Sequence, residues 1–200
     1  MQYTQLQRSM ASGQRIFQTL DVKPDLIDSK NATAIHQLAG DIEFDSVNFN
    51  YLNGEDVLKD ISFNIKSGET VAIVGPTGAG KTTIVALLQR FYDIERGRGS
   101  IKIDGIDIRD VTRNSVVSQM SMVLQEPYLF SGTIADNIKY NHISLSNEKV
   151  VSSAKSVGAH EFIEELPNGY DTEVAERGVN LSLGQRQLIS FARAIAANPA

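Results

Sequence analysis

The apolar residues of the first twenty positions follow a helical rhythm. If Gly13 is counted, they recur at steps of three and four: Tyr3, Leu6, Met10, Phe17 and Leu20. This spacing predicts an amphipathic helix over residues 1–20, with an apolar stripe that needs a partner. Residues 21–40 contain Pro24 and Gly40 and show no sustained period. We therefore predict a linker there.

The period changes to two at Asp41, where we expect a domain that covers residues 41–200. Apolar residues now alternate with polar ones, and the Asn53-Gly54 turn signal interrupts them: Ile42 and Phe44, Val47, Phe49 and Tyr51, then Ile61, Phe63 and Ile65. A further hairpin is centred on Asp104-Gly105. Alternation of this kind predicts antiparallel strands joined by tight turns.

Two continuous apolar runs predict a different kind of strand. Residues 69–74 and 120–124 read as strands buried on both faces, and the first precedes a predicted helix over 81–92. Downstream the pattern is mostly helical, with Ser146 capping a helix that ends at Gly158, a shorter helix before Pro167, and a last helix that carries Leu188 and Phe191. The predicted class is α/β, with a mostly parallel sheet flanked by helices, an antiparallel β part and a helical part.

Composition narrows the function classes. The chain has 200 residues, 42% of them hydrophobic, which suits one domain with an appendage. Its formal net charge of -5 gives no basic footprint for a nucleic-acid partner. The absence of cysteine excludes disulfides and thiolate metal sites. No apolar run approaches the roughly 20 residues of a membrane span.

The strongest chemical signal lies between the first buried strand and its helix. Two glycines five positions apart precede Lys and Thr in the run Gly75, Pro76, Thr77, Gly78, Ala79, Gly80, Lys81 and Thr82. Glycines let successive amides face one point, the helix N-terminus adds its positive dipole end, and the lysine neutralises phosphate charge. The hydroxyl of Thr82 can bind Mg²⁺. We therefore predict a nucleoside triphosphate site, to which the adjacent Thr83 also contributes.

Downstream motifs make the chain similar to the ATP-binding cassette (ABC) family. The segment Leu181-Ser182-Leu183-Gly184-Gln185 resembles the family signature Leu-Ser-Gly-Gly-Gln. Other family elements follow in the expected order: Phe49-Asn50-Tyr51 resembles the aromatic loop, Gln125 the Q-loop, and residues 172–178 the X-loop of exporters. Residues 11–21 are similar to the segment by which exporters leave their last membrane helix and enter the cassette.

The resemblance implies a P-loop ATPase that binds ATP and Mg²⁺. Tyr51 would stack on adenine, Lys81 would contact the phosphates, and Gln125 would reach Mg²⁺ or a water molecule, so that Lys81 and Gln125 are the catalytic candidates. Ser182, Gly184 and Gln185 would face ATP held by a second cassette. The implied assembly is a head-to-tail dimer around two nucleotides, as a homodimer or a heterodimer.

The resemblance also implies a larger parent protein. Residues 1–20 would be the cytoplasmic end of the last transmembrane helix, and the parent would export a substrate from the cytoplasmic face of a membrane. In the family, the helix that ends in Asn-Pro leads to the Walker B strand, which carries an Asp for Mg²⁺ and a catalytic Glu. Here Ala200 follows Asn198-Pro199. We expect a fragment that hydrolyses no ATP and exposes the apolar faces of an incomplete sheet.

Two other functions remain open at this point. One is a soluble cassette of the DNA-repair or translation type, against which the X-loop and the amphipathic lead-in argue. The other is a non-hydrolysing regulatory cassette of a heterodimer. Leu183, where the family has glycine, is compatible with that second alternative. The transported substrate cannot be read from these residues, because it would be selected by membrane helices.

Overall fold

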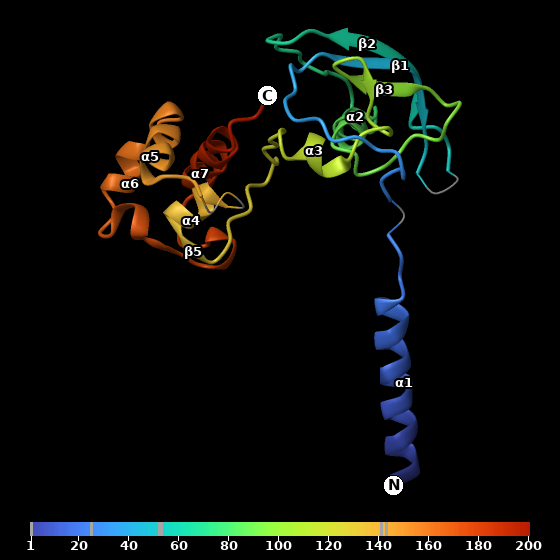
Figure 1. The fold of residues 1–200 in the computed structure, drawn as a ribbon. Helices are drawn as coiled ribbons and strands as arrows, with labels where there is room; N and C mark the ends of the chain where they lie inside the picture. The colour runs from blue at the N-terminus through green and yellow to red at the C-terminus, as the bar shows by residue number, and fades with distance from the viewer. Residues whose placement is uncertain (1, 25, 52–53, 141, 143) are drawn as a thin grey trace.

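The chain forms two lobes and a projecting helix (Figure 1). A computed structural model describes residues 2–24, 26–51, 54–140, 142 and 144–200. Helix α1, Gln2–Leu20, extends away from both lobes and confirms the predicted N-terminal helix. Where its apolar stripe is described, the side chains are exposed: Met10 is 67%, Phe17 66% and Leu20 72% exposed. Among the helices described, none is long and apolar enough to cross a membrane.

The first lobe is built on an antiparallel sheet of four strands in the order β2-β1-β3-β4. These are β1 Ile42–Phe49, β2 Leu58–Ile65, β3 Ser100–Ile103 and β4 Ile106–Asp107. The pairing of β1 with β2 shifts register between Phe44 and Val47, where Ser46 adopts a φ of 49°. This bulge explains why the alternation in the sequence changes phase at that point. Asn53 of the predicted turn lies outside the described residues.

Two helices complete the first lobe, α2 Lys81–Leu88 and α3 Arg113–Val117. They pack with the sheet around a core that includes Phe44, Val47, Leu58, Leu87 and Ile101. Helix α2 ends four residues before the predicted Tyr92. The reason is Arg90, which takes a left-handed φ of 51° while its side chain is drawn into the protein.

The second lobe is mostly helical, as predicted. Its helices are α4 Ile134–Lys139, α5 Asn147–Ser156, α6 His160–Glu164 and α7 Leu183–Ala196. A two-residue ladder joins β5 Gly132–Thr133 to β6 Glu173–Val174, and the short 3₁₀ turns η1 Gly169–Asp171 and η2 Glu176–Gly178 flank β6. The Ser146 hydroxyl accepts from the amide of Lys149, which confirms the predicted cap of α5. The lobe has a core of its own that includes Leu129, Ile138, Ile163 and Ile189.

The two continuous apolar runs do not form the predicted strands. Residues 69–74 and 120–124 carry no strand assignment and pair with no other strand among the residues described. A strand buried on both faces needs neighbours for its backbone groups as well as cover for its side chains. Without them, Val74 is 86% exposed and Leu124 is 52% exposed. Apolar side chains of both segments are thus exposed, but the described residues form no parallel sheet whose faces the prediction concerned.

Candidate functional site

The glycine-rich loop runs directly into α2, as the sequence motif requires. Gly80 precedes α2 with a φ of 84°, and Gly78 has a φ of 85°. A side chain on Gly80 would place its Cβ 2.6 Å from Cδ2 of Leu58 in β2. The loop can therefore lie this close to the sheet only with glycine at position 80.

The Lys81 ammonium lies over the loop that precedes it. Its Nζ atom donates to the carbonyl oxygen of Gly75 at 2.9 Å and to that of Pro76 at 2.8 Å. An ammonium has three donors, so one remains for a ligand. The first amides of α2 have no acceptor within the helix, and the helix dipole adds partial positive charge there. Together these groups make a cradle for a phosphate chain, which we call the cradle below.

Tyr51 lies beside the cradle, as its assignment to the same site predicts. Its hydroxyl donates to the Thr83 hydroxyl oxygen at 2.9 Å. Thr83 is the third residue of α2 and is buried. The Tyr51 ring meets Phe49 and Tyr92 edge to face, with ring centres 4.9 Å and 5.0 Å apart. The ring is 37% exposed, which leaves surface for contact with a ligand base.

The two predicted Mg²⁺ ligands, Thr82 and Gln125, are both exposed. The Thr82 side chain is adjacent to Lys81 at the cradle, while Gln125 follows the unpaired segment 120–124, and no hydrogen bond joins them. The described residues hold no group of three or more His, Cys, Asp or Glu that could enclose a metal ion. This donor set fits a Mg²⁺ ion held largely by phosphate oxygens, with a protein hydroxyl beside them.

The predicted signature begins α7 in the other lobe (Figure 1). Ser182 and Gln185 form a reciprocal capping box: the Gln185 amide donates to the Ser182 hydroxyl at 3.2 Å, and the Ser182 amide donates to Gln185 Oε1 at 2.9 Å. Gly184 is exposed, and Leu183 is 55% exposed. The structure therefore presents this helix start to solvent and does not bring it to the cradle of the same chain.

Residues 172–178 form a turn whose charged side chains point outward. The Asn180 side chain stabilises the turn through two hydrogen bonds to its backbone. Its Oδ1 accepts from the Ala175 amide at 3.0 Å, and its Nδ2 donates to the Glu173 carbonyl at 2.9 Å. Glu173, Glu176 and Arg177 are exposed. This arrangement leaves three charges available to another polypeptide.

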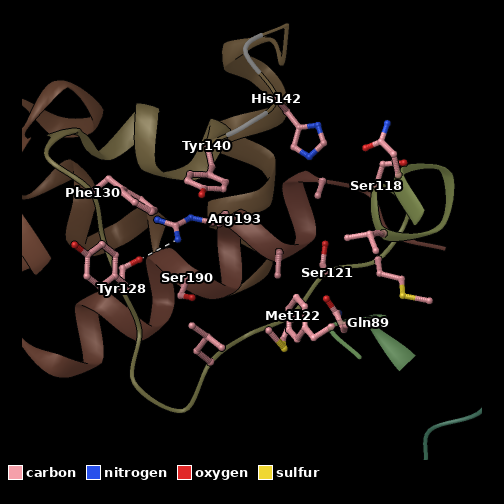
Figure 2. Close-up of a pocket in the computed structure, with 17 residues that line it drawn as sticks. Gln89, Ser118, Ser121, Met122, Tyr128, Phe130, Tyr140, His142, Ser190 and Arg193 are labelled. Atoms are coloured by element: carbon pink, nitrogen blue, oxygen red, sulfur yellow. Dashed lines mark hydrogen bonds between the residues drawn. The ribbon is translucent and has the colours of Figure 1, made fainter. Parts of the chain in front are cut away.

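An open cavity of about 750 Å³ lies between the lobes (Figure 2). Its wall includes the Arg193 guanidinium from α7, which lies 5.0 Å from the ring centre of Tyr140 and 5.8 Å from that of Phe130. Arg193 donates to the Tyr128 carbonyl at 3.0 Å and to the Asn137 carbonyl at 2.7 Å. Burial lowers the pKa of Arg193 below its ordinary value.

Sequence reasoning missed several residues around these sites. Tyr92 packs on Tyr51, Arg193 joins α7 to the chain that follows Gln125, and Arg90 anchors the end of α2. Each is an ordinary polar or aromatic residue in an amphipathic stretch. Their partners lie far away in the sequence, so no local pattern could identify them.

Comparisons with known proteins agree on one family. A family model described as "ABC transporter" matches residues 58–200. An uncharacterised ABC transporter ATP-binding protein, YknV of Bacillus subtilis, is 50% identical over 198 residues, covering 99% of this chain and 32% of its own length. An ATP-dependent lipid A-core flippase of Desulfotalea psychrophila is 48% identical over 193 residues, covering 96% of this chain and 33% of its own length.

A solved structure shows the same relationship. The structure of a bacterial Atm1-family ABC exporter with ATP bound superimposes with a TM-score of 0.89 at 40% sequence identity, and the match covers 98% of this chain and 34% of that one. The chain thus spans about a third of the length of the relatives it matches. From the ordered motifs, the cradle and these matches, we conclude that the chain belongs to the ABC transporter family and forms a nucleotide-binding domain of that family.

Proposed function

We propose that this chain binds Mg-ATP between Tyr51 and the cradle, and that the protein containing it uses ATP hydrolysis to export a substrate. Residues 75–83 would hold the phosphates, and Tyr51 would contact the adenine. Thr82 and Gln125 would bind Mg²⁺. Bound Mg²⁺ would neutralise phosphate charge. The observation that carries the proposal is the cradle itself, where the glycine-rich loop, the N-terminus of α2 and the Lys81 ammonium lie together.

A head-to-tail pair of cassettes is part of the same proposal. The start of α7 exposes Ser182 and Gly184 and has a positive dipole end, while the backbone amides of Ser182 and Gln185 are engaged in the capping box. Its position in the lobe that lacks the cradle supports a role toward nucleotide held by a second cassette. Each chain would then supply two half-sites, and ATP would hold the pair together.

The remaining elements would serve the membrane-embedded part of the protein. The exposed charges of Glu173, Glu176 and Arg177 would be available to a membrane domain, and α1 extends away from the two lobes (Figure 1). These relatives are about three times as long as this chain, and two of them are named as ATP-binding/permease proteins. We place the cassette at the cytoplasmic face of a membrane on this basis.

Equilibrium binding of a fluorescent ATP analogue to the full-length polypeptide that contains this chain tests the proposal. We expect saturable binding that strengthens with Mg²⁺. Lys81→Ala removes the only side-chain cation of the cradle motif and is expected to weaken binding by tenfold or more, because charge-assisted contacts to phosphate are the strong ones. Lys59→Ala, an exposed lysine on β2, is the matched control. Absence of saturable binding to the unaltered protein would refute the proposal.

A further inference from the structure

The segment between α1 and the sheet is held tightly against the first lobe over its second half. We call residues 28–38 the strap. Thr33 pairs with Val111 as an isolated parallel bridge, with its amide donating to the Asp110 carbonyl at 3.1 Å and its carbonyl accepting from the Thr112 amide at 2.9 Å. This backbone pairing ties the middle of the strap to the turn that precedes α3.

Side chains on α3 and just after it hold the rest of the strap. The Ile35 amide donates to the Ser115 hydroxyl at 3.1 Å, and the Leu38 amide donates to Gln119 Oε1 at 2.9 Å. The Gln119 amide nitrogen donates back to the Ile35 carbonyl at 3.1 Å. The Leu38 side chain is buried in the core of the first lobe. The strap is thus fixed by specific contacts along its length.

Arg90 connects the beginning of the strap to the end of α2. Its side chain is only 5% exposed, and Nη1 donates to Asp28 Oδ1 at 3.0 Å and to the Val111 carbonyl at 2.9 Å. Asp93 accepts from Nε at 2.8 Å, and this hydrogen bond is the main cause that raises the pKa of Arg90 above its ordinary value. The same Asp28 oxygen also accepts from the Arg113 amide at the start of α3, at 3.0 Å.

Among the described residues that follow α1, Asp28 is the first whose side chain bonds to the lobe. Val22 is 72% exposed and Ile27 is 69% exposed, while Leu26 is partly buried. A displacement of α1 would therefore reach the lobe first at the pair of Asp28 and Arg90. From Arg90, the eight-residue helix α2 leads directly to Lys81 and the cradle.

We propose that Arg90 is a positioning residue that links the cradle to the N-terminal helix through Asp28. Nucleotide bound at the N-terminus of α2 would stabilise the pair of Arg90 and Asp28 beyond its other end. A strap held by this pair would in turn favour nucleotide binding. This inference rests on the proposed function, since the cradle must bind nucleotide. Thermodynamic linkage requires that nucleotide favours strap docking by the same factor by which strap docking favours nucleotide binding.

Hydrogen exchange of the strap, measured on the full-length polypeptide with and without Mg-ATP, tests this link. We expect Mg-ATP to slow exchange of the Ile35 and Leu38 amides by about fivefold or more, the lower end of the usual range for coupled sites. Asp28→Ala should abolish this slowing and weaken ATP binding by the same factor. Asp28→Asn, which keeps an acceptor without the charge, should give an intermediate result. The Asp28 side chain is 39% exposed, so its replacement leaves the cores intact.

Asp21→Ala, at an exposed position nearer α1, is the matched control and should behave as the unaltered protein. The inference is overturned if ATP binds but leaves strap exchange unchanged, or if Asp28→Ala retains the full ATP-dependent slowing. If the unaltered protein binds no ATP, the proposed function itself fails, and this inference fails with it. Amides of β1, which belong to the sheet and not to the strap, report any general effect of ligand on stability.

Discussion

Gly80 shows how one residue serves both the fold and the site. It has a left-handed φ, and its missing side chain lets the loop approach Leu58, which is itself buried. The motif in the sequence predicts that this glycine belongs to a phosphate site. The contact with β2, by contrast, connects the site to the antiparallel sheet and is visible only in three dimensions.

Gly80→Ala should therefore destabilise the first lobe by about 2 to 4 kcal/mol, from a left-handed alanine together with overpacking against Leu58. Gly78→Ala is the matched control: its φ is nearly the same, but its Cβ would meet nothing within 4 Å. The control should cost only about 1 kcal/mol. Denaturant unfolding, monitored by hydrogen exchange of the β1 and β2 amides, measures the loss of stability in both variants. Equal losses in the two variants would contradict the steric argument.

At the scale of elements, the ends of helices are the features that local sequence encodes best. Helix α4 begins with a capping box in which the Asp136 amide donates to the Thr133 hydroxyl at 3.0 Å, and the Thr133 amide donates to Asp136 Oδ2 at 3.0 Å. Helix α7 repeats the device with Ser182 and Gln185. The hydrogen bonds from Thr133 are the main cause that lowers the pKa of Asp136 below its ordinary value.

This lowered pKa makes a prediction about pH. A carboxylate whose pKa is depressed in the folded state contributes stability that is complete above its unfolded pKa and is lost as pH falls through the folded value. The second lobe should therefore lose stability below about pH 4. Asp136→Asn should flatten this part of the pH dependence, and Thr133→Ala should do the same. Chemical unfolding between pH 3 and pH 6 makes the measurement, and an unchanged slope in Asp136→Asn would refute the assignment.

Strands behave differently from capped helices. The antiparallel strands form as predicted because their neighbours, β1 to β4, lie within the described chain. The runs 69–74 and 120–124 have stronger apolar character, yet they stay unpaired. Hydrophobic pattern predicts what a strand would bury, but a strand forms only where another strand meets its backbone.

At the scale of the whole molecule, the two hydrophobic cores are separate. One core gathers residues from Leu38 to Val116, and the other gathers residues from Leu129 to Ala196. The lobes are connected by the chain around residues 120–128 and by a hydrogen bond from the Ala200 amide to the Gln119 carbonyl at 3.0 Å. Residues of both lobes line the cavity shown in Figure 2.

We therefore expect the two lobes of this chain to unfold independently. Ile163→Ala, in the second core, should destabilise that lobe by about 2 to 5 kcal/mol and leave exchange in the first lobe unchanged. Ile101→Ala should have the reverse effect. Both residues are almost completely buried, which makes them a matched pair. Loss of protection in both lobes from either change would contradict independence.

The sequence by itself determined the site's chemistry and most local elements. The cradle from Gly75 to Thr83, the cap at Ser146 and the alternating strands all depend on residues close together in the chain, so short-range geometry encodes them. Family membership followed from the order of such motifs and was confirmed by the comparisons.

Only the tertiary structure decided which distant groups meet. It placed the Tyr51 hydroxyl on Thr83, drew Arg90 to Asp28 and ended α2 early, and left two apolar runs without partners. These outcomes depend on contacts between residues 30 or more positions apart, or on the lack of such contacts. Spacing along the chain does not predict these contacts, because burial and hydrogen bonding depend on the segment that lies adjacent in space.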